Sequence, residues 1–247
     1  MRKLVILALL LCSFSTLKAQ NWGGGIDQQY FNWGFSFHYV ASELKIFKTT
    51  DWRKRFKDPE QNYTEITDSL SSISSPLSPG FAVGFVLNYN LFPNLDIRST
   101  PSIVFADRMV NYQYSEQVVN QEFIEKKQKV QSTMIDLPLS FKLKSDRRMN
   151  FRAYFLAGLK YSIDMSAGKK AKDANYAAID KLLKNKNKFA SYEVGLGFDF
   201  YFEYFKMSPE IKISHSFNDV LRHEAHPYAT PIDKALLRNF TFSLYFE

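Results

Sequence analysis

Residues 191–204 read Ser191-Tyr192-Glu193-Val194-Gly195-Leu196-Gly197-Phe198-Asp199-Phe200-Tyr201-Phe202-Glu203-Tyr204, with a large apolar side chain at every second position. Between them stand serine, glycine, acidic residues and one tyrosine. Successive side chains of a β-strand point to opposite faces, so a period of two indicates a strand with one apolar and one polar face. The stretch is therefore predicted to be a strand between an apolar and a polar environment.

The same alternation recurs elsewhere, so that eight segments of the chain share it. They are residues 33–46, 80–90, 95–108, 134–144, 151–164, 191–204, 207–217 and 239–246. In the first segment the apolar positions shift after Ser42 to Leu44 and Ile46, which predicts a β-bulge. Pro138 lies in the fourth segment and cannot donate a hydrogen bond to a neighbouring strand.

The connections between these segments alternate in length. Residues 91–94, 145–150 and about 205–207 are short connections, whereas about 48–79, 112–130, 165–190 and 218–238 are long and polar. A membrane-spanning strand needs only roughly 9–11 residues, and outer-membrane barrels have short periplasmic turns and long external loops. The sequence thus predicts an all-β protein, an eight-stranded antiparallel transmembrane β-barrel with short periplasmic turns and long extracellular loops.

Residues 1–19 have the features of a secretory signal peptide. Arg2 and Lys3 precede an apolar run, and small residues lead to a cleavage site after Ala19. We therefore expect residues 20–247 to form the mature barrel in the outer membrane. Cys12 is an alternative lipid-anchor cysteine, although the bulky Leu11 before it disfavours lipoprotein processing.

Removal of the leader changes the cysteine content and the charge of the chain. Cys12 is the single cysteine, so the mature protein has no disulfide, no thiolate nucleophile and no cysteine-based metal site. The chain has 32 Lys+Arg against 25 Asp+Glu, and the leader accounts for three of the basic residues and none of the acidic ones. The mature charge is therefore +4, and nucleic acid is not an expected partner.

A secreted soluble barrel or sandwich would show the same alternation, but with the large apolar side chains inside and the polar ones in water. The polar face of this chain combines charged residues with glycines, and glycine suits a crowded interior better than a solvated surface. The glycines of that face are Gly34, Gly80, Gly84, Gly158, Gly195 and Gly197. This composition favours the membrane barrel over the soluble one.

If the polar face lines the lumen, acidic and basic residues nearly balance there. The acidic ones are Asp96, Asp136, Asp164, Glu193, Asp199, Glu203 and Glu210. The basic ones are Arg98, Arg108, Lys142, Lys144, Arg152, Lys160 and Lys212. Because an eight-stranded barrel has room inside only for side chains, and buried charges must pair, we expect a structural network of ion pairs that plugs the lumen. A proton or ion path is the alternative.

Signals for catalysis or metal binding are weak. His223 and His226 lie in Arg222-His223-Glu224-Ala225-His226-Pro227, which lacks the spacing and the helical context of a zinc-protease helix. The sequence has no nucleophile-elbow serine, P-loop or dinucleotide fingerprint. We therefore predict no enzyme activity, no cofactor, no metal and no small-molecule substrate.

Lysines crowd the long connection at 165–190. They are Lys169, Lys170, Lys172, Lys181, Lys184, Lys186 and Lys188. Residues 176–183 of the same connection are compatible with a short helix. The lysines fit a solvated external loop, and contact with lipopolysaccharide phosphates or with a partner protein is the alternative.

Several short motifs resemble the PorT family of small outer-membrane barrels of Bacteroidetes. They are the opening hairpin of Trp33-Gly34-Phe35 and Phe81 to Tyr89, Leu95-Asp96-Ile97-Arg98-Ser99-Thr100-Pro101, Ile135-Asp136-Leu137-Pro138-Leu139 and the tail from Pro231-Ile232-Asp233-Lys234 to Phe240-Thr241-Phe242-Ser243-Leu244-Tyr245-Phe246-Glu247. The tail further resembles the PorT/SprT proteins of the type IX secretion system. The sequence departs from the commonest outer-membrane pattern because its last residue is Glu247 rather than an aromatic residue.

The resemblance implies a non-enzymatic component for export of proteins with a C-terminal sorting domain, and for gliding motility. Its partners would be outer-membrane lipid, lipopolysaccharide and other secretion-system proteins. A structural or adhesion barrel is the first alternative to this role. A lipid A-modifying barrel enzyme is the second.

Overall fold

The computed structural model describes residues 29–59, 62–115, 124–166 and 176–247, so the predicted signal peptide lies outside the described residues. Among the described residues, no helix is long and apolar enough to cross a membrane. The strands are β1 (Phe31–Lys48), β2 (Lys57–Asp58), β3 (Thr64–Glu65), β4 (Leu70–Ser74), β5 (Ser78–Phe92), β6 (Leu95–Ser99), β7 (Ser102–Ala106), β8 (Arg108–Tyr114), β9 (Glu125–Val130), β10 (Thr133–Lys144), β11 (Phe151–Asp164), β12 (Lys184–Asn185), β13 (Lys188–Tyr201), β14 (Lys206–Ser216), β15 (Leu221–Arg222) and β16 (Ile232–Phe246).

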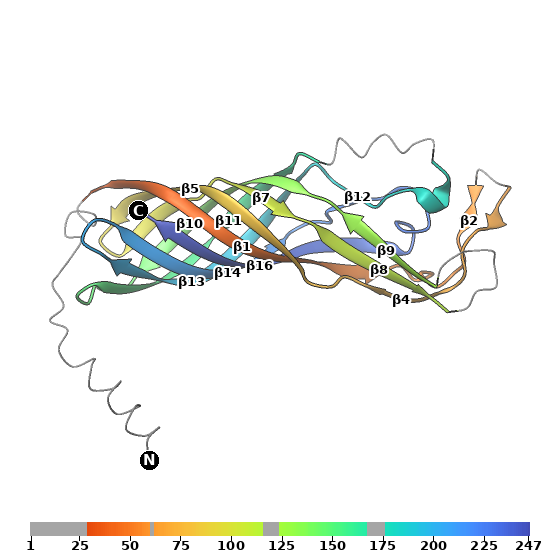
Figure 1. Cartoon of the computed structure of the whole chain (residues 1–247), viewed down its shortest axis with the longest axis horizontal. Helices are drawn as coiled ribbons and strands as arrows, with labels where there is room; N and C mark the ends of the chain where they lie inside the picture. The colour runs from red at the N-terminus through yellow and green to blue at the C-terminus, as the bar shows by residue number, and fades with distance from the viewer. Residues whose placement is uncertain (1–28, 60–61, 116–123, 167–175) are drawn as a thin grey trace, which may run out of the picture.

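The main sheet closes into a ring. Its order is β1-β16-β14-β13-β11-β10-β6-β5-β7, and β1 also pairs with β5, while β10 also pairs with β7. Because β6 and β7 together form one position between β5 and β10, the ring has eight strands, all antiparallel to their neighbours. The predicted eight-stranded barrel is confirmed. β1 begins and β16 ends at the end of the barrel where the short turns lie, called the turn end below (Figure 1).

Pro138 fits into β10 because of a break in the neighbouring strand. β10 pairs with β7 as far as Asp136 and with β6 only from Leu139 onward. The Ser99 hydroxyl donates to the Pro138 carbonyl at 2.8 Å, so the backbone edge of Pro138 faces this break. The N–H that proline lacks would point to the same side, where the ladder is interrupted and needs no donor.

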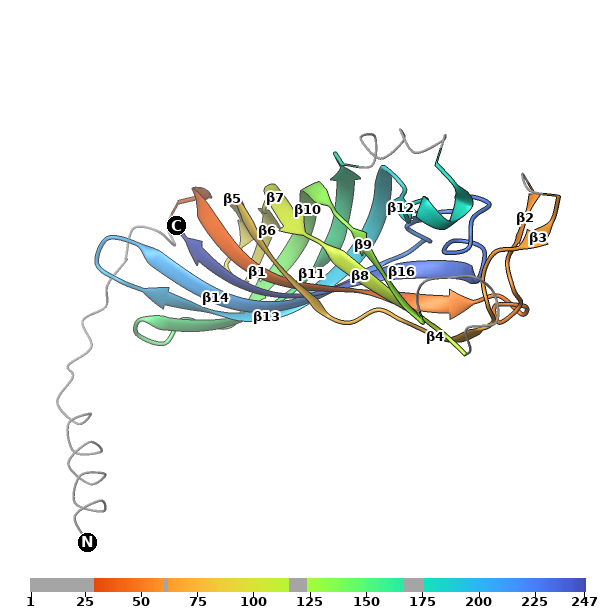
Figure 2. The same cartoon turned by 45° about the vertical axis from the view of Figure 1, so that its right-hand side comes forward.

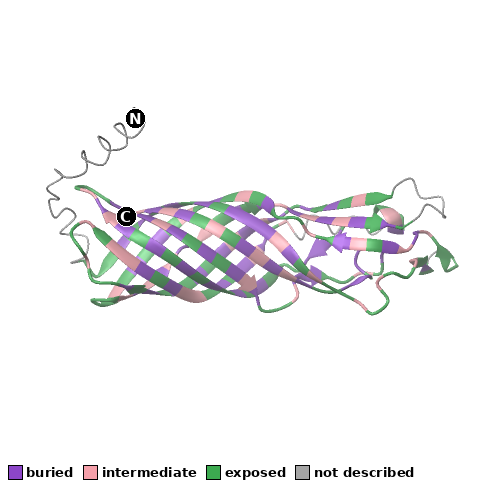
Figure 3. Ribbon diagram, turned by 90° about the horizontal axis from the view of Figure 1, so that it is seen from below, coloured by how far each residue is buried: buried purple, intermediate pink, exposed green. Residues whose placement is uncertain are grey.

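The apolar side chains of the ring face outward. Leu196 on β13 and Ile211 on β14 are each 64% exposed, whereas Lys212 next to Ile211 is only 7% exposed. The same alternation of buried and exposed residues covers the whole barrel wall (Figure 3). A soluble barrel would bury its apolar rows, so this arrangement excludes that alternative and presents the rows to lipid.

Beyond the ring, at the end opposite the turns, the fold continues as an extension. It consists of the last residues of β1, the first half of β16, the sheet β4-β8-β9, the β2–β3 hairpin and the β12–β15 pair (Figures 1 and 2). Its interior is a hydrophobic core that includes Leu44, Val110, Leu221, Tyr228 and Leu237. The interior of the protein therefore changes from polar in the ring to apolar in the extension.

The β-bulge predicted after Ser42 does not occur, and the change from a polar to an apolar interior explains the shift of the apolar pattern instead. β1 pairs with β16 without a register shift from Phe35 to Phe47, and the shift comes only between Phe47 and Lys48. His38 and Leu44 are both buried on the same face of β1. The apolar pattern moves to this face because the surroundings of the strand change from lipid to water while its backbone register does not.

The long connections contain more structure than predicted. β4 lies in the serine-rich segment 69–78, and β8 and β9 form a hairpin across the connection at 112–130. The short helix considered for residues 176–183 is reduced to a single 3₁₀ turn at Ala178–Asp180. Lys169, Lys170 and Lys172 lie outside the described residues.

The outward position of the apolar rows predicts how a charge is tolerated there. We expect Leu196→Arg, in the middle of the apolar row of β13, to reduce the free energy of unfolding by about 2–4 kcal/mol, because the guanidinium would lie in hydrocarbon. Denaturant unfolding from lipid vesicles, followed by the gel shift between folded and unfolded protein, measures this. Leu182→Arg, at an exposed position of the extension, is the control and should be neutral. Equal stability of the two variants would show that the row does not face lipid.

Candidate functional site

The inward side chains of the ring form a polar lumen. Most of the charged residues predicted for the lumen are buried there. These are Asp96, Arg98, Asp136, Lys142, Lys144, Lys160, Asp164, Glu193, Asp199, Glu210 and Lys212. Because no bulk water reaches these side chains, each charge depends on its partners inside the barrel.

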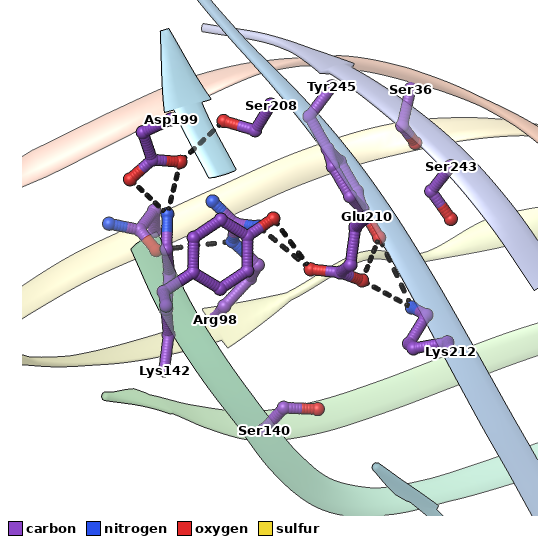
Figure 4. A network of polar contacts seen from close by, with 12 residues as sticks. Ser36, Arg98, Ser140, Lys142, Asp199, Ser208, Glu210, Lys212, Ser243 and Tyr245 are labelled. Atoms are coloured by element: carbon purple, nitrogen blue, oxygen red, sulfur yellow. Dashed lines mark hydrogen bonds and ion pairs between the residues drawn. The ribbon is translucent and has the colours of Figure 1, made fainter. Parts of the chain in front are cut away.

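Glu210 on β14 is the centre of this network (Figure 4). Its carboxylate accepts hydrogen bonds from the hydroxyls of Tyr154 and Tyr245, each at 2.9 Å. Arg98 on β6 and Lys212 on β14 each lie 3.5 Å from it. One carboxylate thus ties together side chains from four strands of the ring.

Lys142 and Asp199 form a second buried pair. The Lys142 ammonium lies 2.7 and 2.8 Å from the two carboxylate oxygens of Asp199, which also accepts the Ser208 hydroxyl at 2.6 Å (Figure 4). The same ammonium stands 3.9 Å from the centre of the Tyr154 ring. This cation therefore has a carboxylate and an aromatic face as partners.

Three further pairs lie around these two. Lys144 and Asp96 are 2.6 Å apart near the turn end of the barrel. Lys160 and Asp136 are 3.0 Å apart toward the extension, and Lys212 reaches Glu193 at 3.8 Å. Serine hydroxyls donate further hydrogen bonds to these carboxylates; for example, the Ser140 hydroxyl donates to Glu193 at 2.8 Å.

His38 is the histidine of the lumen. Its ring nitrogens lie 2.7 Å from the Ser243 hydroxyl and 2.9 Å from the Ser36 hydroxyl. The side chain thereby bridges β1 and β16, which accounts for a buried histidine without a catalytic role.

Three of the residues predicted for the lumen behave differently. Glu203 is exposed, because β13 ends at Tyr201 and Glu203 belongs to the turn that follows. Arg152 is half-buried, opposite Asp199 in the register of β11 and β13. Arg108 is fully buried but begins β8 of the extension, since the third strand of the ring ends at Ala106.

Two charged residues of the lumen, Lys206 and Glu247, were not predicted from the sequence. Glu247 lies 2.7 Å from Arg98 and 2.7 Å from Lys206, and all three side chains are buried. The inward residues of β16 alternate through Ser243 and Tyr245, so extending the pattern by two positions would have found Glu247. The charge of Glu247, which follows β16, thus turns into the lumen.

Free space inside the ring is small. A cavity of about 30 Å³ is lined by His38, Asp136, Lys160 and Glu193 among others. A cavity of this size has room for about one to three water molecules. Glycines allow such dense filling. A Cβ on Gly195 would come within 2.7 Å of Lys212 Cγ, and one on Gly197 would collide with the Tyr154 ring.

The histidines of the connection between β15 and β16 do not act together. His223 lies 3.0 Å from Asp219, whereas the buried His226 accepts the backbone N–H of Tyr228 at 3.3 Å. No group of three or more His, Cys, Asp or Glu side chains that could hold a metal occurs in the part of the chain that the structure describes.

Asp219 anchors this connection to its neighbours. Burial by itself raises the pKa of Asp219, but hydrogen bonds from the Ala235 backbone, the Lys186 ammonium and the Leu221 backbone outweigh burial and hold the pKa below its ordinary value. The Ala235 N–H lies 2.8 Å from the carboxylate and the Lys186 ammonium 3.0 Å. The ionised carboxylate therefore joins β16, β15 and the segment after β12.

Comparison with known proteins identifies the family. The sequence matches the model of the outer membrane protein beta-barrel domain over residues 18–222. The chain belongs to this family. It is an outer membrane protein, so the turn end of the barrel is periplasmic and the extension is extracellular. None of the curated proteins matches the sequence.

Several solved outer-membrane structures are similar to this outer membrane barrel. The attachment invasion locus protein Ail of Yersinia pestis, solved in complex with the heparin analogue sucrose octasulfate, is 10% identical, with 88% of this chain and 99% of Ail covered and a TM-score of 0.36. OprG from Pseudomonas aeruginosa is 11% identical, with coverage of 86% and 94% and a TM-score of 0.39. Neisserial surface protein A is 8% identical, with coverage of 88% and 98% and a TM-score of 0.38.

The Lys142–Asp199 pair of the outer membrane barrel predicts strong coupling between two substitutions. We expect Asp199→Asn to reduce the free energy of unfolding by about 3–5 kcal/mol, because it leaves the buried Lys142 ammonium without a counter-charge. Adding Lys142→Met should recover most of this loss, as a double-mutant cycle in denaturant would measure. Glu203→Gln is the matched control and should leave stability unchanged. Simple additivity of the two lumen substitutions would contradict the pairing.

The low pKa of Asp219 predicts a pH dependence of the extracellular connection. The ionised carboxylate stabilises the fold above the ordinary carboxyl pKa, and this contribution disappears as the pH falls through the lower folded value. We expect the protection of the backbone amides of residues 219–235, relative to their intrinsic exchange rate at each pH, to fall over that acidic range, and Asp219→Asn to lower it already at pH 7. Exchange measured by mass spectrometry tests both, with residues 191–200 as internal reference. Wild-type exchange in Asp219→Asn would show that the carboxylate is not the anchor.

Proposed function

We propose that this outer membrane barrel is a non-enzymatic contact component of the envelope. Its buried charges act as a structural plug of the lumen, and its extracellular extension binds other molecules. The observation that carries this proposal is the combination of a lumen filled by ion pairs with an extension that has its own hydrophobic core. Neither an open pore nor a catalytic group is needed for such a role.

The PorT-like motifs favour a particular assembly for these contacts. We infer that the barrel serves the type IX secretion machinery, where it would bind other translocon subunits rather than conduct cargo itself. A cavity of about 30 Å³ in the lumen supports this division of labour, because a folded cargo protein needs a pore far wider than an eight-stranded barrel. Gliding motility would depend on the barrel wherever gliding uses the same machinery.

A structural or adhesion role is the second candidate. The extension supports it because its strands and apolar core would hold a binding surface in a fixed shape above the membrane. A lipid A-modifying enzyme has less support, since His223 and His226 each serve a local contact.

Deletion of the gene separates these roles. For a secretion component we expect loss of sorting-domain proteins from the medium and the cell surface, restored by the wild-type gene but not by a variant in which a glycine-serine link replaces residues 57–65, the β2–β3 hairpin. The Asp199→Asn/Lys142→Met variant is the control and should restore secretion, because it alters only the lumen. Immunoblots of surface fractions verify that each variant is inserted.

The other outcomes of this experiment are distinct. Normal secretion with altered attachment would reject the secretion role and favour adhesion. A changed mass of lipid A, abolished by His223→Ala or His226→Ala, would reject the non-enzymatic assignment.

A further inference from the structure

A cleft of about 280 Å³ opens in the extracellular extension, remote from the lumen. One wall is the segment 49–57 after β1, with Trp52 and Phe56, and the other is the segment 227–231 before β16, with Pro227 and Pro231. The volume lies close to the lower end of the range for small-molecule sites, roughly 300–1,000 Å³. The cleft therefore suits a small ligand or the end of a longer chain.

The two walls are fixed to each other and to the core. The Thr49 N–H donates to the Pro231 carbonyl at 3.1 Å and joins the walls at one end. The Phe56 N–H donates to the Thr67 hydroxyl at 3.1 Å, and Trp52 packs against the hydrophobic core of the extension. The cleft is thus a preformed feature, which reduces the entropy that a ligand must overcome on binding.

The lining of the cleft combines flat apolar groups with hydroxyls. An indole, a phenyl ring and two proline rings match the C–H face of a sugar ring, which packs well on such surfaces. Thr49, Thr67 and Thr230 also line the cleft, and a threonine oxygen can accept a further hydrogen bond from a sugar hydroxyl. This pattern of apolar walls with a few convergent polar groups is typical of a small-ligand site.

The positive charge of the segment beside the cleft favours sugars that carry an anionic group. Residues 45–57 contain six basic residues and a single acidic one, Asp51. Arg55 is held by Glu65 at 3.0 Å and by the buried Asp68 at 3.7 Å, so its role is structural. Lys48 and Arg53 stand over the Trp52 ring at 3.9 and 4.9 Å. Positive charge therefore surrounds the indole.

Of the three cations among the described residues that line the cleft, Lys54 is the most exposed, and Lys57, with Glu65 at 3.7 Å, is the next. Lys54 pairs with Asp51 at 2.9 Å, but the two side chains are 74% and 64% exposed. An exposed pair of this kind contributes less than about 1 kcal/mol, so an incoming anion can replace Asp51 at little cost. Lys54 is accordingly placed to recognise a carboxylate or phosphate on a sugar held by the walls.

We propose that this cleft binds a saccharide that carries an anionic group, with the sugar ring on Trp52 in place of the Lys48 or Arg53 side chain, the prolines beside it and Lys54 on the anion. The ligand comes either from the lipopolysaccharide of the same membrane or from free polysaccharide. The site is independent of the secretion role and of the lumen.

Isothermal titration of the full-length protein in detergent tests the proposal with trigalacturonic acid and with neutral maltotriose as probes. We expect saturable binding of trigalacturonic acid and binding of maltotriose weakened about tenfold, the factor that 1.4 kcal/mol of charge-assisted contact produces. Lys54→Gln should remove this difference between the probes. Trp52→Leu should abolish binding of both.

Lys127→Gln is the matched control, because Lys127 also forms an exposed pair, with Glu125 at 3.5 Å, but lies on β9 away from the cleft. It should bind trigalacturonic acid like the wild type. Absence of binding to the wild-type protein, or equal losses in Lys54→Gln and Lys127→Gln, would overturn the proposal. Repeating the titration in nanodiscs with and without lipopolysaccharide identifies the source, since a cleft already filled by lipopolysaccharide sugars would bind the probe only in its absence.

Discussion

Closure of the β1–β5 and β1–β16 ladders is the constraint on which the rest of the structure depends. In hydrocarbon no water can replace a missing backbone hydrogen bond, so each spanning strand needs partners on both edges. Pro138 is accommodated only because its backbone edge meets the break between β6 and β7. A ring of eight strands is in turn so narrow that side chains fill it, and the charges within have to neutralise one another.

The membrane boundary changes the solvent outside the protein and with it the composition of the interior. Burying apolar surface is worth roughly 25 cal/mol per Å² when that surface leaves water, and nothing comparable when it leaves lipid. In the ring, therefore, Leu196 and Ile211 face outward and the charges turn inward. In the extension, water surrounds the strands and the apolar residues return inside. β1 passes through both regions with one continuous ladder. His38 and Leu44 therefore share a face, although one is polar and lies in the ring and the other is apolar and lies in the extension.

The spanning strands could be predicted from the sequence because a period of two is a local property, and for the same reason the inward positions of Lys142, Asp199 and Glu210 could be predicted. The ends of the strands could not be predicted, which is why Glu203 was assigned to the lumen, whereas Glu247 was missed although the alternation of β16 reaches it. The extension depends on tertiary contacts that no local pattern encodes, so β4 was taken for a loop. The partner of each charge could not be predicted either. Arg98 and Glu247, for example, are 149 positions apart and meet only because the ring closes with a particular stagger.

The two charged regions of the protein differ in what their surroundings require. In the lumen an unpaired charge costs several kcal/mol, so most acidic and basic side chains form ion pairs within the barrel, and Asp164 instead accepts hydrogen bonds from the Ser132 and Ser166 hydroxyls. On the extracellular extension water and salt screen each charge, and nothing in folding demands a balance. Apart from Arg55, the basic residues at 45–57 make only exposed pairs or contacts with aromatic rings, so they are open to contact with anionic groups outside the chain. Matched charges hold the barrel together, and the unmatched ones are those that a ligand or partner can use.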